Sequence, residues 1–336
     1  MQLALKTRVI KAGSGASSAA AACLQNGGLV AFPTETVYGL GADATDGEAV
    51  AHLYTAKDRP AFNPLIAHVA DAADARNIAT FNEAAERLAS AFWPGPLTLV
   101  LRKRPGCAVS ELATASLESI AVRVPDHPVA QAILRAFGRP VVAPSANISG
   151  HVSPTTAEHV AADLDGRIDL IVDGGPAAVG VESTIVSCLG QPVILRSGGV
   201  ARRMIEDVLG HPVDVCEHEI GDDEAPLAPG MLASHYAPRA RLRLDAAGIF
   251  PGEALLAFGP ALPAGAQGAR TLNLSSRGDV IEAAANLFSH LRSLDASGVR
   301  DIAVMPIPSD GIGAAINDRL RRAAAPKDLS VKKSSS

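Results

Sequence analysis

Up to about residue 210, short apolar runs alternate with longer segments in which apolar residues recur at helical spacing. The short runs are rich in Val, Ile and Leu and predict buried strands. They lie at residues 29–32, 65–69, 97–101, 120–124, 141–143, 170–172, 184–187 and 193–195. The longer segments predict helices, two of which follow a capping residue, Asp46 or Asn82. They lie at residues 17–25, 48–56, 83–92, 129–137 and 157–164. The alternation indicates an α/β fold. Because strands outnumber helices, we expect a twisted, mixed sheet.

The pattern changes at Asp214, where an acidic stretch begins that runs into LAPGMLASHYAPRA. Beyond it, apolar patterning resumes and predicts strands at 254–257, 271–274 and 302–306, a long helix at 280–294, and a last helix within GIGAAINDRLRRAA. We therefore expect a first domain over 1–213, a linker over 214–243, a smaller α/β domain over 244–326, and a flexible polar tail over 327–336.

Composition narrows the class of protein. The chain has 336 residues, of which 48% are hydrophobic, so it can bury two cores and is not intrinsically disordered. A net charge of −5 and only 4% aromatic residues argue against binding nucleic acid through bulk charge or base stacking, so any RNA contact is expected to be transient. Early Lys and Arg residues, four scattered cysteines and the lack of a long apolar run favour a cytoplasmic protein without a membrane segment.

Several common catalytic motifs are missing from the sequence. It has no phosphate-binding loop of the GxxxxGK[ST] type, no HExxH and no GxSxG. Gly311 and Gly313 follow a predicted strand, but a helix-starting turn explains them better than a dinucleotide fingerprint. His211, Cys216 and His218 have a spacing that fits no tetrahedral site, so no metal ligands are predicted.

Polar residues gather where apolar strands end. The first strand runs into PTETVYGLG, which predicts a tight turn that exposes hydroxyls and backbone N–H groups; a plain turn before a helix is the alternative. VVAPSANISG places Ser145, Asn147 and Ser149 after another strand, and VESTIV and ILRSGG place Ser183 and Arg196 at strand borders. Ligands bind at carboxyl ends of strands in open α/β sheets, so these segments form a candidate site.

Cations accompany these hydroxyls. Lys57 and Arg59 follow a predicted helix in KDRPAFNPLIAHV and suit a triphosphate, although the helix dipole alone would also favour them there. Arg123 lies inside the apolar strand AVRVP without a nearby acid, which makes a ligand carboxylate or phosphate its candidate partner. His68, in LIAHV, is by itself more typical of a core histidine. Cations and hydroxyls without matching carboxylates indicate a site that binds a polyanion.

Taken together, these segments resemble the YrdC-type threonylcarbamoyl-AMP synthase family in its long, two-domain form. The resemblance rests on FPTETVYGLGADA, KDRPAFNPLIAHV, FWPGPLTLVL, AVRVPDHP, PSANISG, DGGPAAVGVESTIV, LRSGGV, PGMLASHYAP and GIGAAINDRLRRAA. It covers nearly the whole chain and is most specific in the first domain. The family fold it implies is a twisted mixed-sheet YrdC-like catalytic domain with a concave cavity, plus a Rossmann-like C-terminal domain.

The resemblance implies a reaction in which L-threonine, bicarbonate or CO2, and ATP give L-threonylcarbamoyladenylate and pyrophosphate. Mg2+ would accompany ATP, held by its phosphates because no acidic cluster offers a protein site. A separate transferase complex would then use the product to modify the adenosine beside the anticodon of tRNAs.

The resemblance also implies roles for individual residues. Those expected to hold threonine are Thr36, His68, Arg123, Ala143 and Ser183, with Arg123 facing the carboxylate. Those expected to hold ATP are Lys57, Arg59, Asn63, Ser119, Ser145, Ser153, Arg196 and His235, of which Lys57, Arg59 and Arg196 would be catalytic. His235 and Tyr236 belong to a linker motif expected to cover the cavity as a lid.

The cation-rich motifs predict catalysis by positioning and charge stabilisation: a carbamate of threonine attacks the α-phosphorus and expels pyrophosphate. Two alternatives use the same type of domain. One is an RNA-binding or ribosome-maturation module without adenylate-forming activity, against which the net charge of −5 argues. The other is a carbamoyltransferase for metallocentre maturation, which normally carries Cys-pair zinc modules that this sequence lacks.

Overall fold

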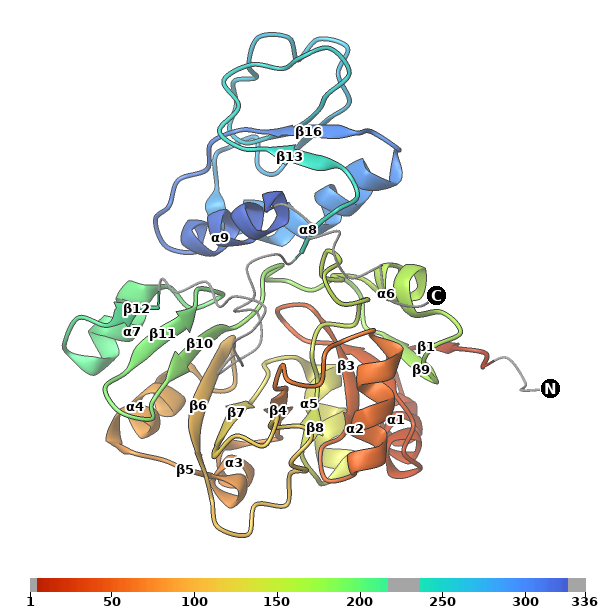
Figure 1. Cartoon of the computed structure of the whole chain (residues 1–336), viewed down its shortest axis with the longest axis vertical. Helices are drawn as coiled ribbons and strands as arrows, with labels where there is room; N and C mark the ends of the chain where they lie inside the picture. The colour runs from red at the N-terminus through yellow and green to blue at the C-terminus, as the bar shows by residue number, and fades with distance from the viewer. Residues whose placement is uncertain (1–4, 217–235, 326–336) are drawn as a thin grey trace, which may run out of the picture.

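A computed structural model describes residues 5–216 and 236–325, which form two domains (Figure 1). The strands of the larger domain are β1 (Arg8–Lys11), β2 (Val30–Pro33), β3 (Tyr38–Asp43), β4 (Ile66–His68), β5 (Ala79–Thr80), β6 (Leu97–Lys103), β7 (Ser119–Arg123), β8 (Val141–Val142), β9 (Leu170–Asp173), β10 (Thr184–Ser187), β11 (Val193–Arg196) and β12 (Asp214–Val215). Its helices are α1 (Ala16–Gln25), α2 (Gly47–Ala56), α3 (Ala72–Ile78), α4 (Glu83–Phe92), α5 (Pro128–Phe137), α6 (Ala157–Leu164) and α7 (Arg202–Leu209). The predicted strands and helices are all present, and Asp46 and Asn82 cap α2 and α4 through hydrogen bonds to backbone N–H groups.

The mixed sheet expected from the sequence is confirmed. The described residues of the larger domain form a 12-stranded sheet in the order β1-β9-β2-β3-β8-β4-β7-β6-β10-β11-β12, with β5 paired to β6. β4 and β7 are parallel, whereas β8 runs antiparallel to β4 and β6 runs antiparallel to β7. Because the strands run in both directions, some have their carboxyl ends on one side of the sheet and some on the opposite side.

In the larger domain, the strands β1, β3, β5 and β12 and the helices α3 and α7 were not predicted. The longest of these strands is β3. The segment PTETVYGLG forms a β-hairpin rather than a turn into a helix, because β3 pairs antiparallel with β2. Its glycines allow unusually close packing: a Cβ atom on Gly41 would lie 2.7 Å from Cε1 of Phe32, and one on Gly39 would lie 3.1 Å from Cβ of Ala143. Close contact between strands, not flexibility, explains these glycines.

The two faces of the large sheet are covered differently. Val30 and Phe32 face α1 and α5, whereas Ala31 faces the main core that includes residues of α2, α4 and α6. The registers place His68 beside Val141 and Arg123 beside His68, so these side chains share the face of α1 and α5. On this face, β4, β6, β7 and β10 carry only a small apolar cluster. The candidate site lies on this part of the sheet.

The smaller domain contains a four-stranded parallel sheet in the order β13-β16-β14-β15. Its strands are β13 (Arg241–Arg243), β14 (Ala254–Ala257), β15 (Thr271–Asn273) and β16 (Asp301–Val304), and its helices are α8 (Val280–Ala296) and α9 (Gly313–Ala324). Both helices lie between this sheet and the larger domain (Figure 1). β12 and β13 belong to the two sheets although both fall within the expected linker, and residues 217–235 and the expected tail 327–336 lie outside the described residues.

The two domains share a packed interface. One hydrophobic cluster joins Val37, Val152 and Val181 of the larger domain to Leu287 and Phe288 of α8. A Cβ atom on Gly180 would lie 2.2 Å from the carbonyl oxygen of Ala284, so only glycine allows α8 to approach this closely. The interface therefore resembles the core of a single domain more than a loose contact between two domains.

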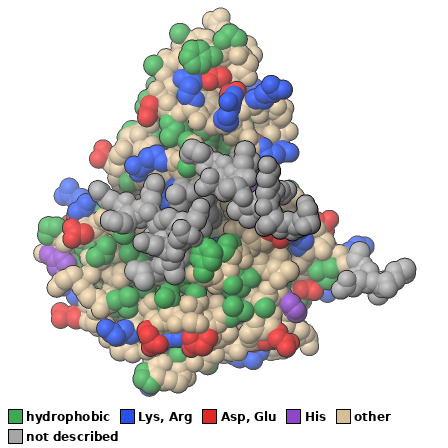
Figure 2. Space-filling model, viewed as in Figure 1, with side chains coloured by type: hydrophobic (Ala, Val, Ile, Leu, Met, Phe, Trp, Pro, Cys, Tyr) green, Lys and Arg blue, Asp and Glu red, His purple; other side chains and the backbone are tan. Residues whose placement is uncertain are grey.

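The surface charges and the hydropathy of the helices indicate which kinds of partner the protein could bind. Acidic and basic side chains are interspersed over the face shown in Figure 2. None of the helices in the described part of the chain combines the length and the hydropathy that a bilayer-crossing segment needs.

Candidate active site

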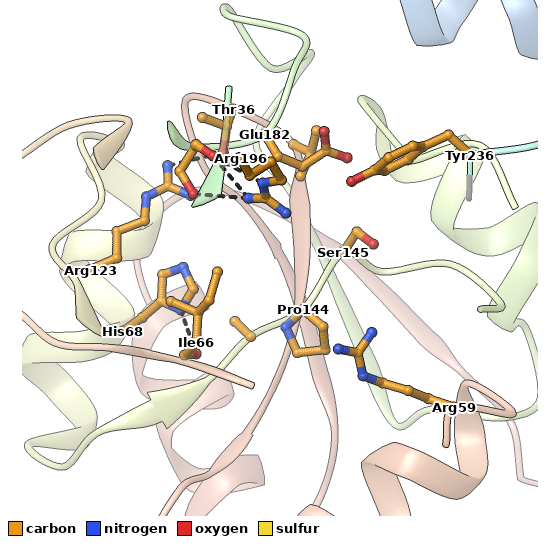
Figure 3. A pocket seen from close by; sticks show the side chains of 13 residues that line it. Thr36, Arg59, Ile66, His68, Arg123, Pro144, Ser145, Glu182, Arg196 and Tyr236 are labelled. Carbon is orange, nitrogen blue, oxygen red and sulfur yellow. Dashed lines mark hydrogen bonds between the residues drawn. The ribbon is translucent and has the colours of Figure 1, made fainter. Parts of the chain in front are cut away.

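A small pocket opens on the sheet face described above. It contains most of the residues that the sequence analysis singled out (Figure 3). Those that line it are Thr36, Arg59, His68, Arg123, Ala143, Ser145, Ser183, Arg196 and Tyr236. Arg123 and His68 lie on one side, Arg59 and Tyr236 on the other, and Arg196 and Glu182 between them (Figure 3).

Strand register explains why these distant residues meet. His68 is the neighbour of Arg123 in the parallel pair β4–β7, and Ile185 is the neighbour of Arg196 in the pair β10–β11. Residues that are neighbours in register project from the same face of a sheet. Ala143 follows β8, which runs antiparallel to β4. The site is therefore built on one face of the sheet. His68, Arg123 and Arg196 are also the last residues of β4, β7 and β11, as the strand-end rule predicted.

Arg123 has an acidic partner that the sequence analysis did not identify. It is 4% exposed, and its Nη2 donates to Oε1 of Glu35 at 2.6 Å and to Oγ1 of Thr36 at 3.0 Å, while Nε donates to the carbonyl of Gly95 at 3.3 Å. The other carboxylate oxygen of Glu35 accepts from the backbone N–H of Asp126. Glu35 thus holds the guanidinium in place. The Nη1 of Arg123 has no hydrogen-bond partner among the described residues and can serve a ligand in the pocket.

His68 is a neutral residue with one defined tautomer. Its Nδ1 lies 3.1 Å from the carbonyl oxygen of Ile66, and because a carbonyl only accepts, Nδ1 carries the proton. Nε2 is therefore a hydrogen-bond acceptor. Burial, together with the positive charge of Arg123, lowers the pKa of His68 to about 3.

The depressed pKa of His68 predicts a pH-dependent stability. The pKa falls from an ordinary 6.5 to about 3 on folding, so the unfolded chain binds more protons between these values. The stabilisation is complete above pH 6.5 and is lost as the pH falls toward 3. Between about pH 7 and pH 5, the unfolding free energy of the wild type should fall more steeply than that of His68→Asn, by up to about 1.4 kcal/mol per pH unit. Urea titrations check this. His159, with a pKa lowered mainly by burial to about 4, is present in both proteins and cancels; equal slopes would contradict the prediction.

The opposite side of the pocket is cationic. Arg59 donates to the carbonyl oxygens of Asn63 and Pro64, at 3.4 and 3.1 Å, and forms no ion pair with any described acid. Burial lowers the pKa of Arg59 to about 10. Arg196 donates from Nε and Nη2 to the carbonyl oxygen of Ser183, at 3.2 and 2.9 Å, and burial lowers its pKa as well. The buried guanidinium of Arg59, bound to carbonyls, carries positive charge that an anionic ligand would neutralise.

Two models of known families match the chain. The model described as "Telomere recombination" matches residues 22–198, and the model described as "Threonylcarbamoyl-AMP synthase, C-terminal domain" matches residues 200–325. A threonylcarbamoyl-AMP synthase of Bacillus subtilis (strain 168) is 44% identical over 319 residues, which cover 91% of this chain and 92% of the relative. The chain belongs to the threonylcarbamoyl-AMP synthase family.

Further members of the family agree in sequence and in structure. A threonylcarbamoyl-AMP synthase of Pyrococcus abyssi is 41% identical, with 93% of this chain and 95% of the relative covered. The crystal structure of P. abyssi Sua5 complexed with L-threonine superposes with a TM-score of 0.86 at 38% identity and covers 95% of this chain and 98% of the other. E. coli YciO, at 23% identity and a TM-score of 0.52, shares the fold of the larger domain.

Not every residue that the family resemblance implied lines the pocket. Lys57 is buried behind it, and its Nζ donates to the carbonyl oxygens of Ser145 and Asn147, both at 2.5 Å. Burial, with the charge of Arg59 nearby, lowers the pKa of Lys57 well below its ordinary value. In this arrangement Lys57 fixes the loop that carries Ser145 and does not itself contact the pocket.

The remaining predicted residues are placed as follows. Asn63 is buried and accepts from Arg59 through its backbone carbonyl, while its Oδ1 has no partner within the described structure. Ser119 lies at the start of β7, opposite Arg102 and away from the pocket lining. Ser153 is buried and donates to Glu182 at 2.5 Å. His235 lies outside the described residues.

The family site contains two carboxylates that the motifs did not suggest. Glu35 contacts Arg123 without lining the pocket, whereas Glu182 does line it. The oxygens of Glu182 accept from Ser153 Oγ and from Arg319 Nε of α9, the latter at 2.7 Å. Burial would raise the pKa of Glu182, but the positive charges of Arg319 and Arg196 outweigh it and lower the pKa, so the carboxylate is ionised. The lining itself stays rich in cations, with Glu182 beside Arg59, Arg123 and Arg196. Both acids are committed to partners, and the described part of the chain has no His/Cys/Asp/Glu group arranged to hold a metal ion.

Proposed function

We propose that this family member forms threonylcarbamoyl-AMP and pyrophosphate from L-threonine, bicarbonate or CO2, and ATP. The observation that carries the proposal is a single pocket lined by Arg123, His68, Arg59 and Arg196. The Nη1 of Arg123 and the Nε2 of His68 have no hydrogen-bond partner among the described residues. Membership of the family, and the sequence identity to synthases from bacteria and archaea, support it.

Thr36, His68, Arg123, Ala143 and Ser183 form the threonine side of the pocket. The guanidinium of Arg123 pairs with the substrate carboxylate, because a cation held by Glu35 is already oriented toward the cavity. The Nε2 of His68 accepts a hydrogen bond from the amine or the hydroxyl of threonine, and Ile66 provides apolar contact for its methyl group. A neutral histidine avoids repulsion with an ammonium group at this position.

Arg59, Ser145 and Arg196 form the phosphate side of the pocket. The threonine amine adds to CO2 with loss of a proton, and an oxygen of the resulting carbamate then attacks the α-phosphorus of ATP. A new O–P bond forms as the bond to pyrophosphate breaks, and the arginines stabilise the charge that develops on the leaving group. Since Glu182 in the pocket and Glu35 behind Arg123 are already paired, catalysis rests on positioning and electrostatics.

Mg2+ would be held by the triphosphate of ATP, where it supplies charge neutralisation. The donor set fits this expectation, because Glu35 and Glu182 are engaged with Arg123 and Arg319 and neither is left to bind a cation.

We expect the product to pass to a transferase complex that modifies tRNA, and the protein to act in the cytoplasm. The four cysteines are free thiols, as expected in a reducing compartment. Charges of both signs are interspersed over the face in Figure 2, which favours at most transient contact with RNA over a dedicated RNA-binding module.

One assay tests the function. The purified protein is incubated with ATP, bicarbonate and one amino acid at a time, and pyrophosphate is measured. We expect release that requires both threonine and bicarbonate, and little release with valine, which has the shape of threonine but lacks the hydroxyl. ATP consumption without threonine, or retention of tRNA without any pyrophosphate release, would contradict the proposal.

A further inference from the structure

One arginine of the smaller domain reaches into the candidate active site. Arg319 lies on α9 and is fully buried, with 0% of its surface exposed. Its Nε donates to Glu182 Oε2 at 2.7 Å and its Nη2 donates to the carbonyl oxygen of Ser197 at 3.0 Å, both in the larger domain. Its Nη1 bonds to the neighbouring Asp318. Two of these three groups of the guanidinium therefore donate to residues of the larger domain.

Arg319 contacts two residues that line the pocket. Besides Glu182, it lies over the ring of Tyr236, with its Cζ 5.0 Å from the ring centroid. Tyr236 also stacks on Phe288 of α8, at 5.8 Å between centroids and 24° between planes. Glu182 and Tyr236 therefore both depend on helices of the smaller domain for their positions.

Docking of the two domains does not require this buried charge. The interface already has a hydrophobic cluster, and Arg292 of α8 donates to the carbonyls of Val152 and Ser153 and pairs with Asp163 at 2.8 Å. A fully buried guanidinium is costly unless it is paired, and an apolar residue of similar size would serve an interface as well or better. A role in the pocket accounts for an arginine at this position.

The charge of Glu182 defines that role. This carboxylate lines a pocket whose proposed substrate carries a triphosphate, so its negative charge opposes binding. Arg319 supplies positive charge to Oε2 of Glu182. Ser153 is uncharged and donates only a hydrogen bond to Oε1. We propose that Arg319 is a positioning residue of the smaller domain that neutralises Glu182 and thereby sets the affinity of the phosphate side for ATP. This inference rests on the proposed function.

The test separates the two sides of the pocket. In Arg319→Met, Glu182 loses its ion-pair partner, and Arg196 offsets only part of its charge. We expect the affinity for ATP to fall by about 30-fold or more, while the affinity for L-threonine stays within about threefold of the wild type. Removing the carboxylate as well, in Arg319→Met/Glu182→Gln, should restore most of the lost ATP affinity. Binding of ATP alone and of L-threonine alone is measured by titration calorimetry, and melting temperatures report folding.

Two further variants keep the test decisive. Arg321→Met removes an exposed arginine of the same helix and should bind both ligands like the wild type. Arg319→Lys retains the positive charge, so it should retain most of the ATP affinity even if Arg319→Met proves too unstable to measure. Equal losses for ATP and threonine in Arg319→Met, no recovery in the double variant, or a loss in Arg319→Lys as large as that in Arg319→Met would each overturn the inference. Wild-type protein that releases no threonine-dependent pyrophosphate would instead refute the proposed function.

Discussion

Replacing Arg123 by methionine should weaken the binding of L-threonine by about 100- to 1,000-fold. The variant loses the positive charge and the Nη1 donor of Arg123, and the neighbouring Arg196 is already bonded to the carbonyl and hydroxyl of Ser183. Titration calorimetry with L-threonine in the absence of ATP measures the effect. Arg139→Met is the matched control, because it removes an arginine from an ion pair with Asp43 that lies away from the pocket, and it should bind threonine normally.

A second variant separates a direct role of Arg123 from an indirect one. In Arg123→Met, Glu35 remains buried without its ion-pair partner, which by itself destabilises the fold by about 3–5 kcal/mol. The double variant Arg123→Met/Glu35→Gln removes that charge and should recover most of the stability measured by urea unfolding. Threonine affinity should stay low in the double variant. Its return would mean that Arg123 serves only to neutralise Glu35.

The regular elements of the fold were accessible from local patterns. Strand β10 and helix α4 were predicted with the limits that the structure shows, at 184–187 and 83–92. In both elements, the spacing of apolar residues and the flanking capping or turn residues indicate the same start and end. β3 was missed because its sequence, YGLGAD, contains two glycines that usually indicate a turn. The structure explains both glycines by their contacts with Phe32 of β2 and with Ala143, which follows β8. Such contacts cannot be inferred from the local sequence.

The pocket residues were found by motif, but their partners were not. Glu35 stands beside Thr36 in the same motif, yet its pairing with Arg123 spans 88 residues of sequence. Arg319 and Glu182 are 137 residues apart and lie in different domains. Nothing in the spacing or the hydrophobic pattern specifies such contacts, because they depend on the packing of α9 against the larger domain. A buried arginine does require a partner, so the lack of a local acid near Arg123 was a usable signal for a distant acid as well as for a ligand.

Lys57 illustrates the limit of assigning a role from residue type. A lysine after a helix and next to Arg59 suggested a phosphate contact, but its ammonium group satisfies the carbonyls of Ser145 and Asn147. The sequence could not distinguish these uses, because the loop after β8 meets the end of α2 only in the folded chain. Lys57 therefore connects the segment after α2 to the loop after β8, and the position of Ser145 depends on this contact.

Replacing Arg196 by methionine should reduce the rate of threonine-dependent pyrophosphate release by about 100- to 1,000-fold. Arg196 is the last residue of β11, and the carbonyl and the hydroxyl of Ser183 hold its guanidinium at the pocket. Its positive charge is therefore in place before negative charge develops on the leaving group. Pre-positioned charge of this kind acts mainly on the transition state, and the loss should therefore appear in turnover more than in threonine affinity. Steady-state pyrophosphate assays, together with threonine calorimetry, distinguish the two.

The comparison with Arg203→Met decides whether the loss is specific to Arg196. Arg203 lies seven residues further along the chain on α7, is exposed, and should tolerate the change with unaltered turnover. Arg196→Lys keeps a positive charge but not the fork that bonds to Ser183, and should retain an intermediate rate. If Arg196→Met released pyrophosphate at the wild-type rate, the charge stabilising the leaving group would have to come from elsewhere, and Arg59 on the opposite side of the pocket would be the next residue to replace.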